Sequence, residues 1–202
     1  MSTPLVVDAS KLPPAAFGKR SALWWGIVGM ITIESTMFGI LAASYFYIRL
    51  SFKEWPPHGT PNPDLVVPTV MVVLLVLSII PVYIADQLSI SGKNNRAMMF
   101  WVWVSIIAGF VLMAVRAFEF GALRCRWDDN AYGSVVWLTI GMHTSHLLAS
   151  TIETLVLALH LRGNRIDTKH RVDVHVDTVY WYFVVAAWVI FYFIIYWSPR
   201  WL

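Results

Sequence analysis

The hydrophobic positions of this chain gather into five long segments, at about residues 21–48, 65–85, 97–120, 133–160 and 178–197. Each segment approaches or exceeds the ~20 apolar residues that an α-helix needs to cross a bilayer. Polar residues, glycines and prolines fill the stretches between them. The pattern therefore predicts an all-α, polytopic membrane protein, with a bundle of five transmembrane helices forming one domain over residues 21–202.

The composition agrees with this prediction and excludes other classes of protein. Charged residues make up 13% of the 202 residues, about half of the ~25% found in soluble domains. The pI of 9.1 accompanies long apolar runs rather than a basic face, so we expect no nucleic-acid binding. Cys125 is the only cysteine, which excludes an internal disulfide and any metal site built from several cysteines.

The distribution of Lys and Arg predicts the orientation. Nine of them lie in the N-terminal tail and in the second and fourth loops, against five on the opposite side. The positive-inside rule then places the N-terminus in the cytoplasm and the C-terminus outside. Residues 1–20 are expected to form a mobile cytoplasmic tail. Pro81 is expected to kink the second span near its end.

Glu34 is a carboxylate near the middle of the first apolar segment. Insertion scales put the cost of an Asp at that depth at about 2.5–3.5 kcal/mol, and such residues usually face other helices or water. Glu34 is therefore a functional-site hypothesis. Two interpretations stay open: a polar group that packs helices together, and a group that exchanges protons.

Further polar residues interrupt the third and fourth segments. Arg116 and Glu119 are three residues apart, share a helix face and are expected to form a structural ion pair. His143 and His146 share a face of the fourth segment, which Glu153 continues. We expect structural hydrogen bonding from the two histidines rather than a metal site, because a metal usually needs three or four protein ligands.

Glu34 and His146 lie at the same estimated depth. Glu34 is 13 residues from the inner end of the first segment, and His146 is 13 residues from the outer end of the fourth. Because a helix rises 1.5 Å per residue, both residues fall near the middle of the membrane. If the first and fourth helices touch, these two side chains could form a buried hydrogen bond or ion pair. The run Tyr180-Trp181-Tyr182 opens the fifth segment and is expected to form an aromatic belt at the membrane interface.

Seven short motifs resemble, in order, those of the third subunit of haem–copper terminal oxidases, the cytochrome c oxidase subunit III family. In this sequence they read Glu34-Ser35-Thr36-Met37-Phe38, Trp55-Pro56-Pro57, Glu119-Phe120, Tyr132-Gly133-Ser134, Gly141-Met142-His143-Thr144-Ser145-His146, Tyr180-Trp181-Tyr182-Phe183 and Ile195-Tyr196-Trp197. Together they cover about residues 21–197. The five-segment count is similar to the short bacterial form of that family.

The resemblance implies an accessory subunit without a redox centre of its own. In that family haem and copper belong to subunits I and II, while subunit III packs against subunit I, binds phospholipid and supports proton uptake and lasting activity. We therefore expect a multi-pass protein of the bacterial inner membrane, with subunits I and II and phospholipids as partners. The complex would be a proton-pumping cytochrome c oxidase of the aerobic respiratory chain, which reduces oxygen to water.

Four positions depart from the family pattern. Arg116 stands where relatives have Gln, Tyr182 and Val185 replace a His and an Asp, and Glu153 lies where relatives are apolar. The sequence indicates a divergent branch, in which the hydrogen bonds of the missing His and Asp are absent or relocated. The electron donor, cytochrome c or quinol, the haem types and the bound lipids do not follow from the sequence.

Three alternatives remain at this point. The chain could be the equivalent subunit of a quinol oxidase or the accessory protein of a nitric oxide reductase. It could be a proton-coupled transporter whose path is lined by Glu34, His143, His146 and Glu153, although five spans without an inverted repeat are unusual for one. It could also be an intramembrane metalloenzyme that uses the two histidines.

Overall fold

The structure of this chain, a computed structural model, describes the backbone of residues 22–163 and 168–201 and the side chains of residues 22–162 and 171–201. The predicted tail, residues 1–20, lies outside the described residues. Within the described residues the regular structure is entirely helical, which confirms the predicted all-α class. The elements are α1 (Ala22–Leu50), α2 (Val66–Leu77), α3 (Ile79–Ser91), α4 (Asn95–Ala122), α5 (Ala131–Gly163), α6 (Thr168–Tyr192), the π-helical turn η2 (Phe193–Trp197) and α7 (Ser198–Trp201).

Four helical stretches among the described residues are long and apolar enough to cross a bilayer. They are Ala22–Leu50, Val66–Ser91, Asn95–Ala122 and Arg171–Trp201. These stretches make the protein a multi-pass membrane protein by length and composition. The remaining long helix, α5, has 33 residues but carries polar side chains along much of its length, so composition alone does not mark it as a span.

The second span is interrupted just before Pro81, the residue expected to kink it, and this place is near the middle of the span rather than near its end. α2 ends at Leu77 and α3 begins at Ile79, with Ser78 between them. Pro81 follows in the first turn of α3; it has no N–H to donate to the Leu77 carbonyl, and its ring crowds that oxygen. The helix continues to Ser91, six residues beyond the expected end at residue 85.

The last long helix begins ten residues earlier than predicted, at Thr168 instead of residue 178. Tyr180 and Trp181 therefore lie well inside α6, and both are buried in the bundle. Trp181 Nε1 donates a hydrogen bond to Ser78 Oγ, 3.0 Å away, at the break of the second span. The prediction of an interfacial aromatic belt here is wrong, because the polar residues before Tyr180 extend the helix instead of ending it.

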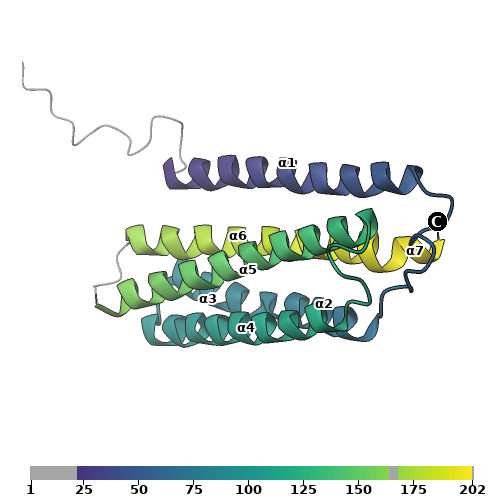
Figure 1. The fold of residues 1–202 in the computed structure, drawn as a ribbon. Coiled ribbons are helices and arrows are strands. Elements are labelled where there is room, and N and C mark those ends of the chain that lie inside the picture. The colour runs from purple at the N-terminus through teal and green to yellow at the C-terminus, as the bar shows by residue number, and fades with distance from the viewer. Residues whose placement is uncertain (1–21, 164–167, 202) are drawn as a thin grey trace, which may run out of the picture.

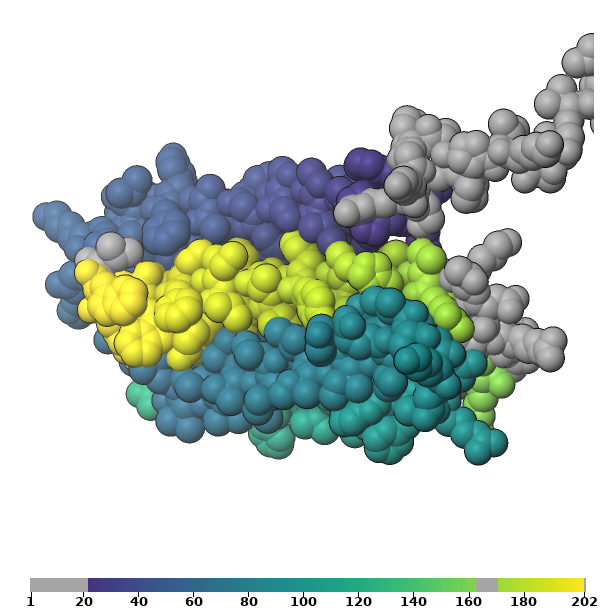
Figure 2. Space-filling view, turned by 180° about the vertical axis from the view of Figure 1, so that it is seen from behind, coloured from purple at the N-terminus to yellow at the C-terminus, as the bar shows by residue number. Residues whose placement is uncertain are grey.

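α6 is the central element, since it packs against α1, α2, α3 and α5. Figure 1 shows α1 along one side of the bundle, with α5 and α6 between it and the layer formed by α2, α3 and α4. From behind, α6 runs between α1 and the second span (Figure 2). α1 is the least buried of the long helices and contacts only α5 and α6 extensively.

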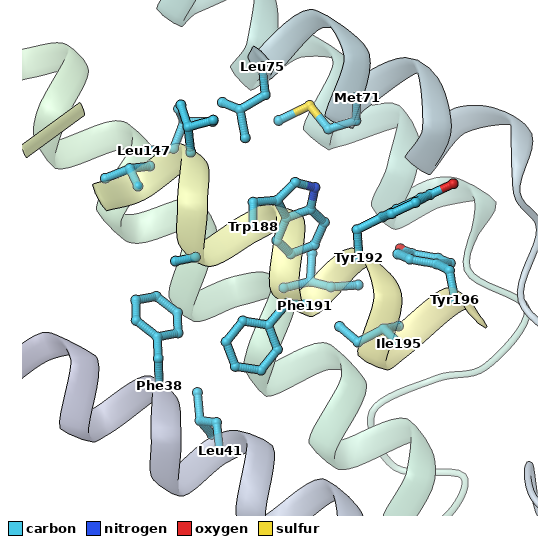
Figure 3. Packing of buried hydrophobic residues seen from close by; sticks show 14 of the residues in the cluster. Phe38, Leu41, Met71, Leu75, Leu147, Trp188, Phe191, Tyr192, Ile195 and Tyr196 are labelled. Atoms are coloured by element: carbon cyan, nitrogen blue, oxygen red, sulfur yellow. The ribbon is translucent and has the colours of Figure 1, made fainter. Parts of the chain in front are cut away.

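The core gathers around Trp188 of α6, which is fully buried. Figure 3 shows the side chains that surround it, among them Phe38 and Leu41 of α1, Met71 and Leu75 of α2, Leu147 of α5 and Phe191 of α6. α4 and α5 pack closely at Gly109, where an added Cβ would lie 2.6 Å from Thr151 Oγ1. Glycine is therefore required at this helix crossing.

Candidate functional site

Glu34 lies in the middle of α1 and contacts both neighbouring helices. Tyr180 of α6 donates its hydroxyl proton to Glu34 Oε1 over 3.2 Å. His146 of α5 places Nε2 3.7 Å from Glu34 Oε2. Oε2 is buried and has no hydrogen-bond partner among the described residues. The structure thus brings together Glu34 and His146, as their equal depth suggests, and adds Tyr180. These three residues form the open centre.

A hydrogen bond on the other side of the ring fixes the tautomer of His146. Nδ1 lies 2.7 Å from the carbonyl oxygen of Met142, one turn earlier in α5. A carbonyl only accepts, so Nδ1 carries the proton. In the neutral ring Nε2 then holds a lone pair, and Nε2 is the nitrogen nearest Glu34. Phe38 packs against the imidazole with ring centroids 5.0 Å apart.

Arg116 lies in a second polar group, the closed centre, made with Glu119, His143 and Tyr196. Arg116 Nη1 donates to Glu119 Oε2 at 2.6 Å, and Arg116 Nη2 lies 2.9 Å from His143 Nδ1. On its far side, His143 Nε2 donates to the carbonyl oxygen of Val184 at 3.0 Å. Because that carbonyl only accepts, His143 Nδ1 is free to accept from Arg116, and the ring is neutral.

Tyr196 completes the closed centre by donating its hydroxyl proton to Glu119 Oε1 at 2.6 Å. It lies in η2, the π-helical turn that follows α6. Such a turn rotates the side chains after it relative to a regular α-helix. Trp188 covers the Arg116 guanidinium, whose carbon lies 3.7 Å from the ring centroid. Arg116, Glu119, His143 and Tyr196 are all about 1% exposed or less.

The two histidines therefore share a helix face but not a partner. His143 belongs to the closed centre and His146 to the open one, and their protons lie on different ring nitrogens. Within residues 22–162 and 171–201, no group of three His, Cys, Asp or Glu side chains is arranged to hold a metal ion. His143 is hydrogen-bonded within the closed centre, whereas His146 is hydrogen-bonded to its own helix and lies within ion-pair distance of Glu34.

Glu153 lies seven residues after His146, two turns along α5, and is exposed beside a groove. Asp177 of α6 also lines this groove. The Thr154 hydroxyl of α5 lies 2.9 and 3.0 Å from the two carboxylate oxygens of Asp177. Glu153 interacts electrostatically with both Glu34 and Asp177. Sequence reasoning missed Asp177, because the predicted fifth span began one residue after it.

A further pair joins α3 to α6. His175 Nδ1 lies 3.0 and 3.2 Å from the two carboxylate oxygens of Asp86. Asp86 is buried, whereas the His175 side chain is 42% exposed. Sequence reasoning missed this pair because Asp86 falls just past the expected end of the second span, and His175 precedes the expected start of the fifth. Longer helix boundaries would have found both.

The Trp55-Pro56-Pro57 motif anchors the loop after α1. Trp55 is buried, and its Nε1 donates to the Tyr45 hydroxyl at 2.8 Å. That hydroxyl lies 3.0 Å from Ser198 Oγ of α7. Tyr132 packs edge-on against the indole with centroids 5.0 Å apart. The motif therefore connects the ends of α1, α5 and α7.

The two departures in α6 lie in different surroundings. Val185 is buried in the main hydrophobic cluster, where an Asp would need a hydrogen-bonding partner. Tyr182 is partly buried at the edge of that cluster. Polar contacts to the carboxylates of the two centres come instead from Tyr180 of α6 and Tyr196 of η2, which donate to Glu34 and Glu119.

Comparison with known proteins supplies the family. The profile of the family described as Cytochrome c oxidase subunit III matches residues 12–200. The chain is 27% identical over 174 residues to a cytochrome c oxidase subunit 3 of Thermostichus vulcanus, covering 85% of each chain. It is 25% identical over 174 residues to one of Synechocystis sp., covering 85% of this chain and 74% of that one. It is 27% identical over 184 residues to a cytochrome c oxidase subunit 3 of Paracentrotus lividus, covering 88% of this chain and 70% of that one. This chain belongs to the cytochrome c oxidase subunit III family.

Proposed function

We propose that this chain is the accessory, non-redox subunit III of a haem–copper cytochrome c oxidase in a bacterial inner membrane. The observation that carries the proposal is the family match over residues 12–200. Haem and copper belong, in this proposal, to subunits I and II, with which the chain assembles. The complex transfers electrons to oxygen and pumps protons, while this chain supports that chemistry from beside it.

Within that role we assign different tasks to the two polar centres. The closed centre holds α4, α5 and α6 together, because its four side chains are hydrogen-bonded to one another and to the Val184 carbonyl, and only the Nε atom of Arg116 within it has no partner among the described residues. The open centre leaves a buried carboxylate oxygen of Glu34 without a hydrogen bond and pairs it with a histidine lone pair. This second arrangement favours a proton-linked role that sustains proton uptake by the catalytic subunit.

The test is replacement of Glu34 by Ala in the intact complex. Haem spectra and initial activity should stay near wild type, because no haem is bound near Glu34 in this proposal. Activity during prolonged turnover should decline faster than in wild type. Wild-type behaviour in activity, decay and subunit retention would contradict the assignment. A purified chain that transports ions alone, without a haem-bearing subunit, would contradict the oxidase proposal itself.

We also propose five membrane crossings, with the N-terminus inside and α5 as the fourth. The supporting observation is that α5 has 33 residues, longer than the ~20 that a crossing needs, and packs along α1, α4 and α6.

Asp128→Cys would place a cysteine just before α5, and Arg162→Cys would place one in the last turn of α5. A membrane-impermeant maleimide should reach these two cysteines from opposite sides. We expect labelling of the first from outside and of the second from inside. Labelling of both from one side would refute the crossing. The native Cys125 gives little background, because burial, with a smaller contribution from the charge of Asp129, raises the pKa of its thiol to about 11.

A phospholipid chain is the proposed occupant of an apolar groove between α1 and α6. The groove has a volume of about 330 Å³ and is lined by Phe38, Gly39, Phe183 and Ile190, among others. A Cβ at Gly39 would meet no atom within 4 Å, so the side chain introduced by Gly39→Leu begins in open space and occupies part of the groove. Native mass spectrometry of the complex should then show less bound phospholipid; an unchanged lipid count would contradict this assignment.

A further inference from the structure

A groove of about 310 Å³ opens where the start of α1, the end of α5 and the start of α6 meet. That volume is far larger than the ~30 Å³ share of one water molecule in the liquid. Its polar lining consists of Glu153, His160, Asp173 and Asp177, and its apolar lining consists of Leu23, Val156, Leu157 and Val176. In the proposed orientation this end of the bundle faces the cytoplasm.

Polar side chains continue from the groove toward the open centre on both helices. On α6, Asp177 precedes Tyr180 by three residues, so the two lie on one face. On α5, Ser150 lies between His146 and Glu153 on one face. The Ser150 side chain is fully buried, and its hydroxyl has no hydrogen-bond partner among the described residues. Side chains that can donate or accept hydrogen bonds therefore lie between the groove and the open centre on both helices.

The open centre has the geometry of a site for one proton. His146 Nδ1 is committed to the Met142 carbonyl, so only Nε2 and the Glu34 carboxylate compete for a further proton. With one proton between them the pair is neutral, either as carboxylic acid and imidazole or as carboxylate and imidazolium. With none it carries a net negative charge, and with two a net positive charge, both of which are costly inside a membrane.

The neighbouring side chains do not neutralise the charge of the Glu34–His146 pair in place of that proton. Tyr180 of α6 already donates to Glu34 Oε1. His143 interacts electrostatically with His146 but is itself held neutral between Arg116 and a backbone carbonyl. Among the described residues, His146 is the only basic side chain within ion-pair distance of Glu34.

We infer that the groove is a proton entrance and that Glu153 links it to the Glu34–His146 pair, which holds a single exchangeable proton. Loading transfers H⁺ from a hydronium ion in the groove, through Glu153, to the Glu34 carboxylate or His146 Nε2 and leaves water. Unloading is the reverse, so only O–H and N–H bonds form and break. The inference deepens the proposed function and rests on it only for which aqueous side the groove faces.

The test uses the intact complex labelled with ¹⁵N-histidine, in lipid, with the His146 signal assigned by its loss in His146→Gln. In wild type, the spectrum should show a proton on or shared with Nε2 as well as the one on Nδ1. In Glu34→Gln, Nε2 should become an ordinary acceptor. After transfer to D₂O, exchange of the Nε2 proton should slow by about tenfold or more in Glu153→Leu.

Controls separate this route from general structural damage. Ile152→Leu changes the exposed neighbour of Glu153 outside the groove and should leave exchange at the wild-type rate. Glu153→Gln keeps the size of the side chain and decides the result if the leucine variant does not assemble. Wild-type exchange in the assembled Glu153 variant overturns the route, and an unchanged His146 spectrum in Glu34→Gln overturns the one-proton pair.

These readouts do not depend on turnover. A one-proton pair in a complex whose lasting activity ignores Glu34 would support this inference and refute the proposed role of Glu34. Loss of lasting activity in the Glu34 variant, together with an unchanged His146 spectrum, would support the proposed role of Glu34 and refute the one-proton pair.

Discussion

Glu119 and Glu34 are both carboxylates within helices of this bundle, yet their surroundings differ in kind. Glu119 accepts from Arg116 on one oxygen and from Tyr196 on the other, both at 2.6 Å. Glu34 accepts one longer bond from Tyr180, and its second oxygen has no hydrogen-bond partner among the described residues. Hydrogen bonds to both oxygens hold a carboxylate in position and favour its charged form. A carboxylate with a free oxygen beside a histidine lone pair can change its protonation without breaking the fold.

The histidines repeat this contrast three residues apart. His143 bridges Arg116 and the Val184 carbonyl and thus connects three helices. His146 uses one nitrogen on its own helix and leaves the other for Glu34. The comparison teaches that spacing on a helix face does not define a site. The partners on neighbouring helices decide what each residue does.

The largest expected effect comes from removing only one charge of the buried ion pair in the closed centre. Arg116→Leu leaves Glu119 buried without its cation and should destabilise the subunit by about 3–5 kcal/mol. The double change Arg116→Leu with Glu119→Gln removes both charges and should cost less. Thermal unfolding of the complex and retention of the subunit in it measure the loss of stability in the single and the double variant. If the single and double variants were equally unstable, the ion-pair account of the closed centre would be wrong.

A smaller and closely matched comparison removes one hydroxyl from each centre. Tyr196→Phe deletes a short, fully buried bond to a carboxylate and should cost about 1.5–3 kcal/mol, the range for hydrogen bonds to charged groups. Tyr180→Phe deletes the 3.2 Å bond to Glu34 and should cost about 1 kcal/mol or less. The melting temperatures of the two variant complexes, compared with wild type, test the order. A larger loss in Tyr180→Phe would reverse the distinction between the centres.

The smallest effect is expected at Glu153. Its side chain is exposed beside the groove, so Glu153→Gln should change stability by no more than about 0.5 kcal/mol, as is usual for surface substitutions. Differential scanning of the complex is sufficient to measure it. A loss comparable to that of Tyr196→Phe would show that Glu153 belongs to the packing of the bundle rather than to an aqueous groove.

The sequence predicts much of this arrangement where the relevant distance lies along one helix. The spacing of Arg116 and Glu119 predicts their contact because residues three apart share a face. Equal depth predicts that Glu34 and His146 could meet, because the rise per residue is constant. Both contacts are present, although the roles assigned to these residues stay predictions.

Contacts between distant segments could not be predicted in the same way. Tyr180 and Tyr196 reach their carboxylates from 146 and 77 residues away, and the π-helical turn that presents Tyr196 has no clear signal in the sequence. The tautomers of the two histidines follow from backbone carbonyls whose positions only the fold supplies. Asp86, His175 and Asp177 were missed for a simpler reason: the helices extend beyond the hydrophobic segments.

The most direct test of the central claim, that Glu34 is proton-linked rather than structural, is the decay of activity during turnover in Glu34→Gln. The amide keeps the size of the side chain and can still accept the hydrogen bond from Tyr180. Unlike the carboxyl group, it does not take up and release a proton near neutral pH. We predict faster decay than in wild type, with unchanged haem spectra, melting temperature and subunit content. Decay at the wild-type rate, or faster decay accompanied by loss of the subunit, would contradict the claim.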